Sequence, residues 1–315
     1  MSFGQVVRVS RPVRACLSGE DLDWLGGRSV CVALDLLTTV EVNGGVAADC
    51  VSDPTLVEWT GGIWRFLGER IPCLEQDPPR VRVWSDAPRA SGLSSSTALI
   101  LAIFETFVAT ITTAPPVPLD VIVAWAFEFE FAICNGGGMD HLAIARGGAT
   151  LFGGRTSGLP ELIDHVDFPA EWSLVVVDSG TPKSTPHHIR SVRAQYASSD
   201  PVLADYVERS DAASGLVWDA IRARHLLALT DAMTEAHRAM RDLQKMSTPL
   251  LEQLRSLARS AVGLPLKVSG AGGGGALVGV CPAVDAAAIT AALLVAYRTQ
   301  PGVQVIVAKS VVAYS

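Results

Sequence analysis

Short apolar runs rich in β-branched residues, with partial polar alternation, mark the first third of the chain. Such runs are typical of half-buried strands, and they predict strands at residues 6–9, 14–18, 29–34, 38–42 and 80–84. One stretch with helical spacing, from about Thr55 to Leu67, interrupts them. We therefore expect a sheet-rich beginning with one helix inserted into it.

Two long apolar stretches follow and predict buried helices. The first runs from Thr97 to about Thr112, directly after three serines, and the second runs from Leu119 to Cys134. Asp120 near the start of the second suits the positive end of a helix dipole. Residues 148–152 and 174–178 are then predicted to form a pair of strands around Gly- and Pro-rich turns. A helical block is expected from about residue 186 to residue 261.

The closing region predicts a small sheet. Strand candidates at residues 266–269, 276–280 and 303–307 enclose a glycine cluster and a helix at about residues 284–298. This order is typical of an antiparallel sheet covered by helices. A change of pattern near residues 155–172 is the predicted domain boundary.

Composition and charge narrow the class of protein. The chain has 315 residues, 49% of them hydrophobic and 18% charged, which suits two halves that share an interface. The formal net charge of −7 argues against sequence-independent binding of nucleic acid. The first residues lack the apolar run of a signal peptide, and the most apolar helix is too short for a bilayer. We expect a soluble cytoplasmic protein, monomer or homodimer, without membrane or nucleic-acid partners.

The cysteines are scattered without C-x-x-C spacing. This pattern favours reduced thiols packed as small hydrophobic side chains over a zinc site or a disulfide framework. The six are Cys16, Cys31, Cys50, Cys73, Cys134 and Cys281.

The first chemical signal is the stretch S91-G-L-S-S-S-T-A98 at the start of a predicted helix. Serine is a favoured N-cap residue, and this explains one serine or two. It does not explain Gly92 before them or three hydroxyls in succession. A glycine-containing loop that opens a helix turns several backbone N–H groups toward one point, where a phosphate fits. A serine hydroxyl there can also bind Mg²⁺.

The second signal is G270-A-G-G-G-G275, between two strand candidates. It matches the letters of the dinucleotide fingerprint, but that fingerprint opens a helix, and here a strand follows. A strand-to-strand loop that passes close to a ligand is the better interpretation, with a plain hairpin turn as the alternative.

The third signal is the acidic cluster in R14-A-C-L-S-G-E-D-L-D-W-L-G-G27. Its three carboxylates are either a solvated turn or a grip on a ligand with several hydroxyl groups. The fourth is E128-F-E-F-A-I-C-N-G-G-G-M-D-H141. Glu128 and Glu130, two residues apart on a helix, cannot point the same way. Asp140 is either a helix cap or a site residue, and His141 is expected to be a structural hydrogen-bonding residue.

Taken together and in their order along the chain, the four signals resemble the three conserved-motif regions and the catalytic-Asp region of the GHMP kinase superfamily. S91-G-L-S-S-S-T-A98 and K267-V-S-G-A-G-G-G-G-A276 are similar to its phosphate loop and its third motif, and the segment from Pro12 to Gly27 resembles the first motif in its galactokinase form. G136-G-G-M-D-H141 resembles the stretch that holds the catalytic Asp, and no Walker-A pattern is present.

The resemblance implies a two-domain α+β fold with the active site between the domains. The N-terminal domain, residues 1–165, would be an α/β domain of the ribosomal protein S5 domain 2-like type with a left-handed crossover. The C-terminal domain, residues 166–315, would be a ferredoxin-like α+β domain with the glycine-rich third motif.

The resemblance also implies residue roles. Asp140 would be the catalytic base, paired with Arg14, while Ser96 and Glu130 would bind Mg²⁺, with Ser95 as the near alternative to Ser96. Loop amides would bind the phosphates of ATP, and acidic and glycine residues would bind the acceptor. The implied nucleotide-binding residues are Ser91, Gly92, Leu93, Ser94, Ser95 and Ser96. The implied substrate-binding residues are Glu20, Asp21, Asp23, Gly138, Asp140, Gly273 and Gly274.

Some positions depart from the galactokinase pattern. Asp21 replaces a histidine, His141 replaces a glutamine, and the chain is shorter, which argues against galactose but leaves an anomeric sugar kinase open. The segment 178–193 concentrates positive charge in an acidic protein. It is either a solvated helix face or an anion site for a phosphate or carboxylate on the sugar, formed by Lys183, Arg190 and Arg193 with His187 and His188 nearby.

The implied function is ATP- and Mg²⁺-dependent phosphorylation of the anomeric 1-hydroxyl of a monosaccharide or a sugar phosphate, such as a heptose or octose phosphate. One alternative is a mevalonate-type kinase, which three clustered carboxylates disfavour because they repel an acid. The other is a non-catalytic ATP- and sugar-binding sensor, which the presence of Asp140, Arg14 and Glu130 disfavours. The identity of the sugar stays open.

Overall fold

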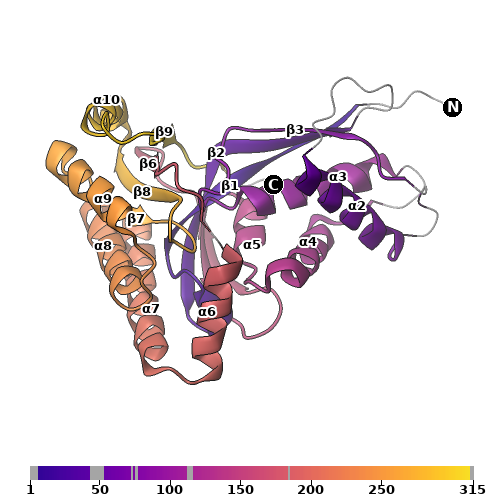
Figure 1. Cartoon of the computed structure of the whole chain (residues 1–315), viewed down its shortest axis with the longest axis horizontal. Coiled ribbons are helices and arrows are strands. Elements are labelled where there is room, and N and C mark those ends of the chain that lie inside the picture. The colour runs from indigo at the N-terminus through magenta and orange to yellow at the C-terminus, as the bar shows by residue number, and fades with distance from the viewer. Residues whose placement is uncertain are drawn as a thin grey trace.

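The computed structural model describes residues 6–42, 53–71, 74, 77–111, 116–183 and 185–312. Within these ranges the chain forms two antiparallel sheets with helices packed against them (Figure 1). None of the helices in the described ranges has the length and apolar character needed to cross a membrane.

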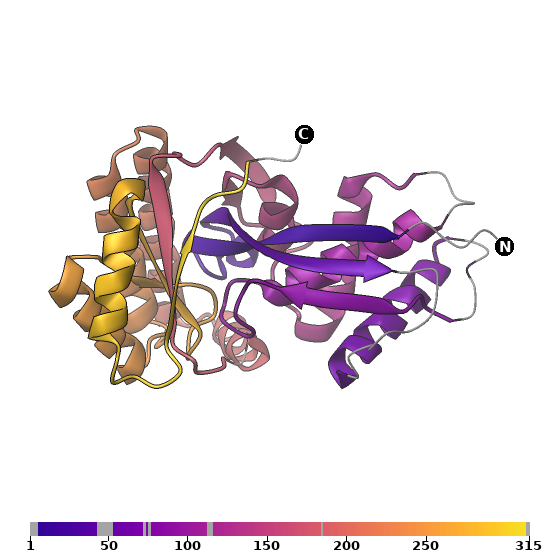
Figure 2. The same cartoon turned by 90° about the horizontal axis from the view of Figure 1, so that it is seen from above.

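The first sheet is organised around one long strand, β2 (Arg28–Val42), which pairs with three others. Strand β1 (Val7–Ser18) follows it along its length, β3 (Val81–Ser85) pairs with its end, and β4 (Ala149–Gly153) pairs with its beginning. Strand β5 (Glu161–Val166) forms the edge beside β4. The predicted strands at 29–34 and 38–42 are therefore one continuous strand, as Figure 2 shows in the long arrows at the centre.

Five helices among the described residues belong to this half. They are α1 (Leu22–Leu25), α2 (Pro54–Gly68), α3 (Ser95–Thr110), α4 (Leu119–Cys134) and α5 (Met139–Arg146). Helix α3 packs on β1 and β2 and is covered by α2 and α4, so it is apolar on nearly all sides, as a buried helix must be. The three long predicted helices are confirmed, although Thr112 lies outside the described residues.

The second sheet has the order β7-β8-β6-β9. Its strands are β6 (Trp172–Asp178), β7 (Lys267–Val268), β8 (Ala276–Pro282) and β9 (Gln304–Ala308). Both faces are covered: Leu174 and Val176 join the core shared with the first sheet, while Val175 and Val177 pack toward α9 and α10. Burial on both faces explains why β6 is continuously hydrophobic from Leu174 to Val177.

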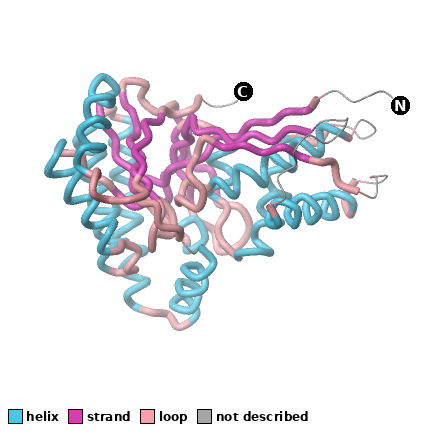
Figure 3. Tube along the Cα trace, turned by 45° about the horizontal axis from the view of Figure 1, so that its top comes forward, coloured by secondary structure: helices cyan, strands magenta, loops and turns pink. Residues whose placement is uncertain are grey.

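Helices fill the rest of the second half. They are α6 (Thr185–Ala197), α7 (Pro201–Arg222), α8 (Leu226–Asp242), α9 (Pro249–Val262), a short 3₁₀ turn (Ala283–Asp285) and α10 (Ala286–Ala296). Figure 3 shows helices on the outer side of the second sheet, with the strands of both sheets nearer the middle. The predicted helical block and the predicted closing sheet are both confirmed.

One strand prediction is wrong. Strands β4 and β6 do not pair, because β4 lies between β2 and β5 in the first sheet, whereas β6 lies between β8 and β9 in the second. The missed strand, β5, has Leu162 and Ile163 exposed at the sheet edge, so it lacks the apolar alternation that predicts a half-buried strand.

The chain passes from the first sheet to the second between Val166 and Trp172. Its end then returns to the first sheet: the Val311 amide donates to Ala33 O at 3.1 Å, and the Gly148 amide donates to Val311 O at 2.6 Å. The predicted boundary between the two domains, at residues 165 and 166, stays a prediction. The C-terminal end lies beyond this boundary in the sequence, yet it packs with the N-terminal half.

The described cysteines are free thiols: Cys16, Cys31, Cys134 and Cys281. Three of these four are buried, in line with the expectation of small hydrophobic side chains, while Cys134 is half-buried. Cys50 and Cys73 lie outside the described residues.

Candidate active site

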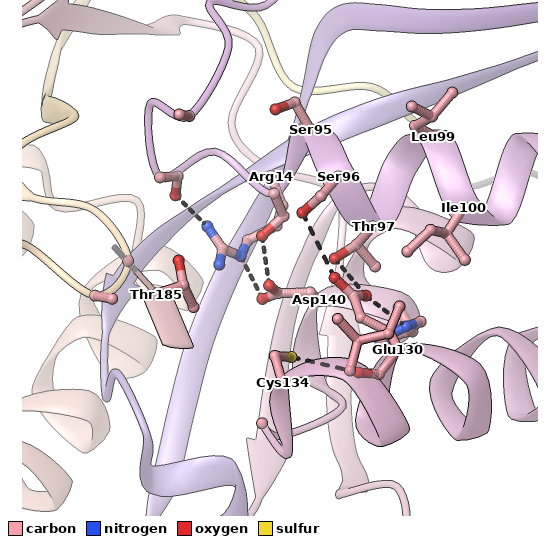
Figure 4. Close-up of a pocket in the computed structure, with 18 of the residues that line it drawn as sticks. Arg14, Ser95, Ser96, Thr97, Leu99, Ile100, Glu130, Cys134, Asp140 and Thr185 are labelled. Carbon is pink, nitrogen blue, oxygen red and sulfur yellow. Dashed lines mark hydrogen bonds and ion pairs between the residues drawn. The ribbon is translucent and has the colours of Figure 1, made fainter. Parts of the chain in front are cut away.

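A pocket of about 610 Å³ lies where the four sequence signals meet. Strand β1, the loop before α3, the start of α5 and the loop after β7 all line it, together with the segment that leads into α6. Figure 4 shows Arg14, Asp140, Ser96, Thr97 and Glu130 pointing toward one another across this pocket. Residues more than 250 positions apart therefore share one cavity, as Arg14 and Gly270 illustrate.

The loop before α3 has an unusual backbone. Ala90, Gly92 and Ser94 have φ values of 55°, 89° and 58°, so alternate residues are left-handed. Such alternation turns successive N–H groups inward to form a concave anion-binding nest. Ser94 is the N-cap residue of α3, but its side chain makes no cap hydrogen bond. The N-cap interpretation of the serines therefore does not describe Ser94, and the positive end of α3 faces the pocket.

The first and third motifs hold this loop in place. Arg14 on β1 donates its backbone N–H to Leu93 O at 3.0 Å, and Ala276 at the start of β8 donates to Ser91 O at 2.6 Å. Position 92 must be glycine, because a β-carbon there would lie 2.3 Å from the carbonyl oxygen of Ser269. Ser91 and Leu93, which were predicted to bind the nucleotide, are buried and do not line the pocket, and their carbonyl oxygens hold the loop in place.

Asp140 lies at the floor of the pocket in the first turn of α5. Its Oδ1 accepts a 2.7 Å hydrogen bond from Arg14 Nε, and its Oδ2 accepts a 2.5 Å hydrogen bond from Ser94 Oγ. Burial raises the pKa of Asp140, but the charge and hydrogen bond of Arg14, with the hydroxyl of Ser94, hold this pKa below its usual value. The helix-cap alternative is wrong, because the N-cap residue of α5 is Gly138.

Glu130 on α4 reaches back toward the start of α3. Its Oε2 accepts a 2.9 Å hydrogen bond from Thr97 Oγ1, and its Oε1 lies 3.5 Å from Ser96 Oγ. His141 Nε2 lies 3.0 Å from Glu130 Oε2. Glu128 points the other way and pairs with Arg70 at 2.8 Å, as helix geometry predicts for positions two apart.

The oxygen atoms of Ser96 and Glu130 suit a magnesium ion. A hydroxyl and a carboxylate are hard oxygen ligands, and Mg²⁺ in kinases is held by one or two such groups together with phosphate oxygens. Both side chains line the pocket, beside the loop whose amides face it. Ser96, rather than Ser95, contacts Glu130.

The three acidic residues of the first motif have separate partners. Glu20 is buried and accepts a hydrogen bond from Lys267 on β7, and its Oε1 also accepts one from the Gly270 amide at 3.3 Å. Asp21 Oδ2 lies 2.6 Å from His188 Nε2 on α6. Asp23 Oδ2 accepts a 3.0 Å hydrogen bond from the Met139 amide. All three line the pocket, so the solvated-turn alternative is wrong.

Asp23 differs from the other two because its recorded partner is an amide rather than a cation. Its pKa is raised to about 7, chiefly by burial and further by the charges of Asp140 and Asp21, while the Met139 amide and the charge of Arg14 oppose the rise. A β-carbon at Gly137 would lie 1.8 Å from Asp23 Oδ2. Gly137 is therefore required for the position of Asp23.

The glycine loop reaches the pocket through other residues than predicted. Gly270 and Ala271 line the pocket, whereas Gly273 and Gly274 do not. Gly273 donates to Met246 O at 2.7 Å, and Gly274 packs beside Thr181 O. Gly138 also lies outside the lining, against Leu159 and Phe127.

The predicted anion site is not assembled. Lys183 lines the pocket, but Arg190 and Arg193 do not. Arg190 is exposed, and Arg193 donates to Asn135 O at 2.8 Å and stacks over Trp24 at 4.5 Å. Of the two histidines nearby, His188 lines the pocket and His187 is exposed.

Two groups of residues at the site are absent from the sequence-based predictions. Thr97, which lines the pocket, binds the predicted residue Glu130, and Lys267, which is buried behind the pocket lining, binds the predicted residue Glu20. A lysine inside the apolar strand L266-K-V268 is a signal that could have found the second contact. At the far end of the pocket lie side chains from β3, α2 and the segments beside them: Asp53, Trp59, Trp84 and Arg89. No pattern connects these four in the sequence.

Two family models match the chain. The one described as "GHMP kinases N terminal domain" matches residues 60–148, and the one described as "GHMP kinases C terminal" matches residues 219–298. The galactokinase of Actinobacillus succinogenes is 26% identical over 283 residues, covering 78% of this chain and 73% of that protein. The mevalonate kinase of Bos taurus is 25% identical over 292 residues, covering 83% and 69%.

Solved structures agree in fold. Lactococcus lactis galactokinase, complexed with galactose, has a TM-score of 0.77 at 18% identity and covers 98% of this chain and 95% of its own. Methanococcus jannaschii mevalonate kinase has a TM-score of 0.77 at 16% identity and covers 98% and 99%. The predicted two-domain α+β fold is confirmed. Galactokinases and mevalonate kinases both match, so the comparisons do not separate the two substrate classes.

Proposed function

The chain belongs to the GHMP kinase superfamily, and we propose that it transfers the γ-phosphoryl group of ATP to a sugar hydroxyl. The proposed acceptor atom is the anomeric 1-hydroxyl of a monosaccharide or a sugar phosphate. The observation that supports this most is the position of Asp140, held by Arg14 and Ser94 in the same pocket as the anion-binding loop. A carboxylate held beside a phosphate site is what transfer to a hydroxyl requires.

The loop residues bind and align the phosphates. Gly92, Ser94, Ser95 and Ser96 line the pocket at the positive end of α3, where the left-handed residues keep the loop concave, and their backbone N–H groups would bind the phosphates. Phosphoryl transfer needs alignment and charge stabilisation more than covalent help, so a loop whose shape is fixed in advance contributes directly to the rate.

Asp140 orients the acceptor hydroxyl and accepts its proton. Because its pKa is held below the usual value, the carboxylate is ionised at neutral pH and is ready to accept a hydrogen bond. Arg14 fixes the plane of the carboxylate through Nε and donates through Nη1 to Gly92 O at 2.8 Å. One side chain thus couples the position of the base to the position of the phosphate loop.

Ser96 and Glu130 would hold Mg²⁺ on the side of the loop that faces α4. When bound, the ion neutralises charge on the phosphate oxygens. The hydroxyl of Thr97 keeps the Glu130 carboxylate turned toward Ser96.

The acceptor would occupy the part of the pocket near Asp23. Among the four carboxylates that line this end, Asp23 is held by an amide, so its free oxygen can exchange hydrogen bonds with a sugar hydroxyl. Glu20 is turned toward Lys267, and Asp21 toward His188, so both act on the shape of the pocket more than as free ligands.

A mevalonate-type kinase is the second candidate, because Lys183 adds a positive charge that could attract an acid. A coupled ADP-release screen separates the two. The panel holds free hexoses, uronic acids, heptose and octose phosphates, and mevalonate. ADP release with a sugar or a sugar phosphate supports the proposal, whereas turnover of mevalonate alone supports the second candidate. ATP binding without turnover of any acceptor would favour a sensor over an enzyme.

A further inference from the structure

Lys183 stands where the two glycine-containing loops approach each other. A β-carbon added at Gly270 would lie 3.0 Å from Lys183 Nζ, and one added at Gly92 would lie 3.6 Å from the same atom. The loops themselves nearly touch, since a β-carbon at Gly270 would lie 2.8 Å from Gly92 O. The ammonium group therefore sits at the junction of the phosphate loop and the third motif.

The carboxylates around Lys183 are already paired. Asp140 pairs with Arg14 at 2.7 Å, Asp21 pairs with His188 at 2.6 Å, and Glu20 pairs with Lys267. Among the described residues, no carboxylate forms an ion pair with Lys183 itself. Lys183 is therefore a cation of the pocket wall whose neighbouring carboxylates are all engaged with other cations.

The ammonium group of Lys183 lies near a second cation, the guanidinium group of Arg14. Burial and the neighbouring charge of Arg14 lower the pKa of Lys183 to about 8, against the opposing effect of the nearby carboxylates. Two cations that face the same small space repel each other, and an anion placed between them removes this cost. The pocket is therefore arranged to receive negative charge at this point.

We propose that Lys183 is a catalytic residue that contacts the transferring γ-phosphoryl group. This rests on the proposed kinase function. A phosphate already on the acceptor would need several donors of its own, and Arg190 and Arg193 lie outside the pocket. The γ-phosphoryl group, in contrast, has most of its oxygens bound by loop amides, so a single point charge completes its surroundings.

In the transfer step, the acceptor oxygen forms a bond to the γ-phosphorus. The bond between that phosphorus and the oxygen bridging to the β-phosphate breaks, and its electron pair leaves with ADP. The proton of the acceptor hydroxyl goes to Asp140. Lys183 keeps its own proton and stabilises the charge on the oxygens in transit.

The test compares Lys183→Met with the matched control Lys309→Met, which removes an exposed lysine away from the pocket. Calorimetry measures the binding of ADP and of a non-hydrolysable imido analogue of ATP, both with Mg²⁺. We expect Lys183→Met to weaken the triphosphate about 10-fold relative to ADP. The control variant should bind both nucleotides as the unchanged protein does.

Kinetics provide the second measurement. With a turned-over acceptor, kcat of Lys183→Met should fall about 100-fold, while the KM of the acceptor changes little. Lys183→Arg should restore part of the loss, because it returns the charge. Equal loss of ADP and triphosphate binding, or a defect confined to the KM of acidic acceptors, would overturn the proposal. Absence of nucleotide binding by the unchanged protein would instead refute the kinase function itself.

Discussion

Ser94 Oγ donates a 2.5 Å hydrogen bond to Oδ2 of Asp140, so the N-cap residue of α3 binds the proposed base instead of its own helix. The left-handed backbone of Ser94, with φ of 58°, directs its side chain to α5. The phosphate loop and the proposed base are therefore connected through one hydroxyl group. A change in the conformation of the loop would change the position of the Asp140 carboxylate.

Ser94→Ala should shift the acidic limb of the rate profile. The pKa of Asp140 is lowered in part by this hydroxyl, so its removal raises that pKa, and the limb of kcat against pH moves to higher pH. We expect a loss of about 10-fold in kcat at neutral pH, since one hydrogen bond to a charged group is removed. Ser95→Ala is the matched control, and an identical profile in both variants would contradict the assigned role of Ser94.

Asp140→Asn should abolish most turnover and leave nucleotide binding intact. The amide keeps the shape of the side chain but cannot accept a proton, and general-base catalysis contributes about 10²–10⁴-fold. Rapid-mix kinetics and calorimetry with the imido analogue of ATP measure the two properties separately. Full activity of this variant would exclude Asp140 as the base.

Gly137→Ala should damage acceptor binding selectively. Its β-carbon would lie 1.8 Å from Asp23 Oδ2, so the carboxyl group must move. We expect the acceptor KM to rise at least about 10-fold, while nucleotide affinity stays unchanged. Gly61→Ala on α2 is the control, because its β-carbon meets nothing within 4 Å. An unchanged acceptor KM in Gly137→Ala would argue that Asp23 does not contact the acceptor.

Lys267→Met should destabilise the fold, because Lys267 and Glu20 are both almost fully buried. Without the ammonium group, the Glu20 carboxylate is buried without a cation, which costs about 3–5 kcal/mol. The double variant with Glu20→Gln should recover part of this loss, since it removes the charge as well. Urea unfolding of the unchanged protein, Lys267→Met, Glu20→Gln and the double variant measures the coupling, and additive effects of the two changes would show that the pair is not an energetic unit.

The order of elements and the main motifs could be predicted from sequence, because each depends on local pattern. The buried helix α3 is a long apolar run, and the phosphate loop is a run of small residues directly before it. Strand β5 could not be predicted, since its stability comes from pairing with β4 rather than from its own pattern.

Partners across the fold were also beyond prediction. Glu20 and Lys267 are 247 positions apart, and no local signal joins them. The sequence left the charged residues of segment 178–193 open between a solvated helix face and an anion site. In the structure Ile189 and Val192 form the buried face of α6, which leaves Arg190 at the surface. Which side chains of a helix reach a pocket depends on the face that packs, and tertiary contacts decide this.

The contact between Asp21 and His188 should make stability depend on pH in a way that a single variant can reveal. Burial lowers the pKa of His188, but the charge and hydrogen bond of Asp21 outweigh this and raise it above the ordinary value. A histidine whose pKa is raised in the folded state contributes stability fully below its unfolded pKa of about 6.5. This contribution is lost as pH rises through the folded pKa. Lys183 and Glu20 are the other charged groups near His188, with Lys183 opposing the rise and Glu20 adding to it.

Asp21→Asn removes the negative partner. We therefore expect the difference in unfolding free energy between the unchanged protein and this variant to be larger at pH 6 than at pH 9. Urea unfolding at several pH values measures the difference, with Asp120→Asn at the start of α4 as the control. Because the pair joins the first motif to α6 at the pocket wall, the acceptor KM of Asp21→Asn should rise in parallel. A stability difference that does not change with pH would show that His188 is not held in its charged form by Asp21.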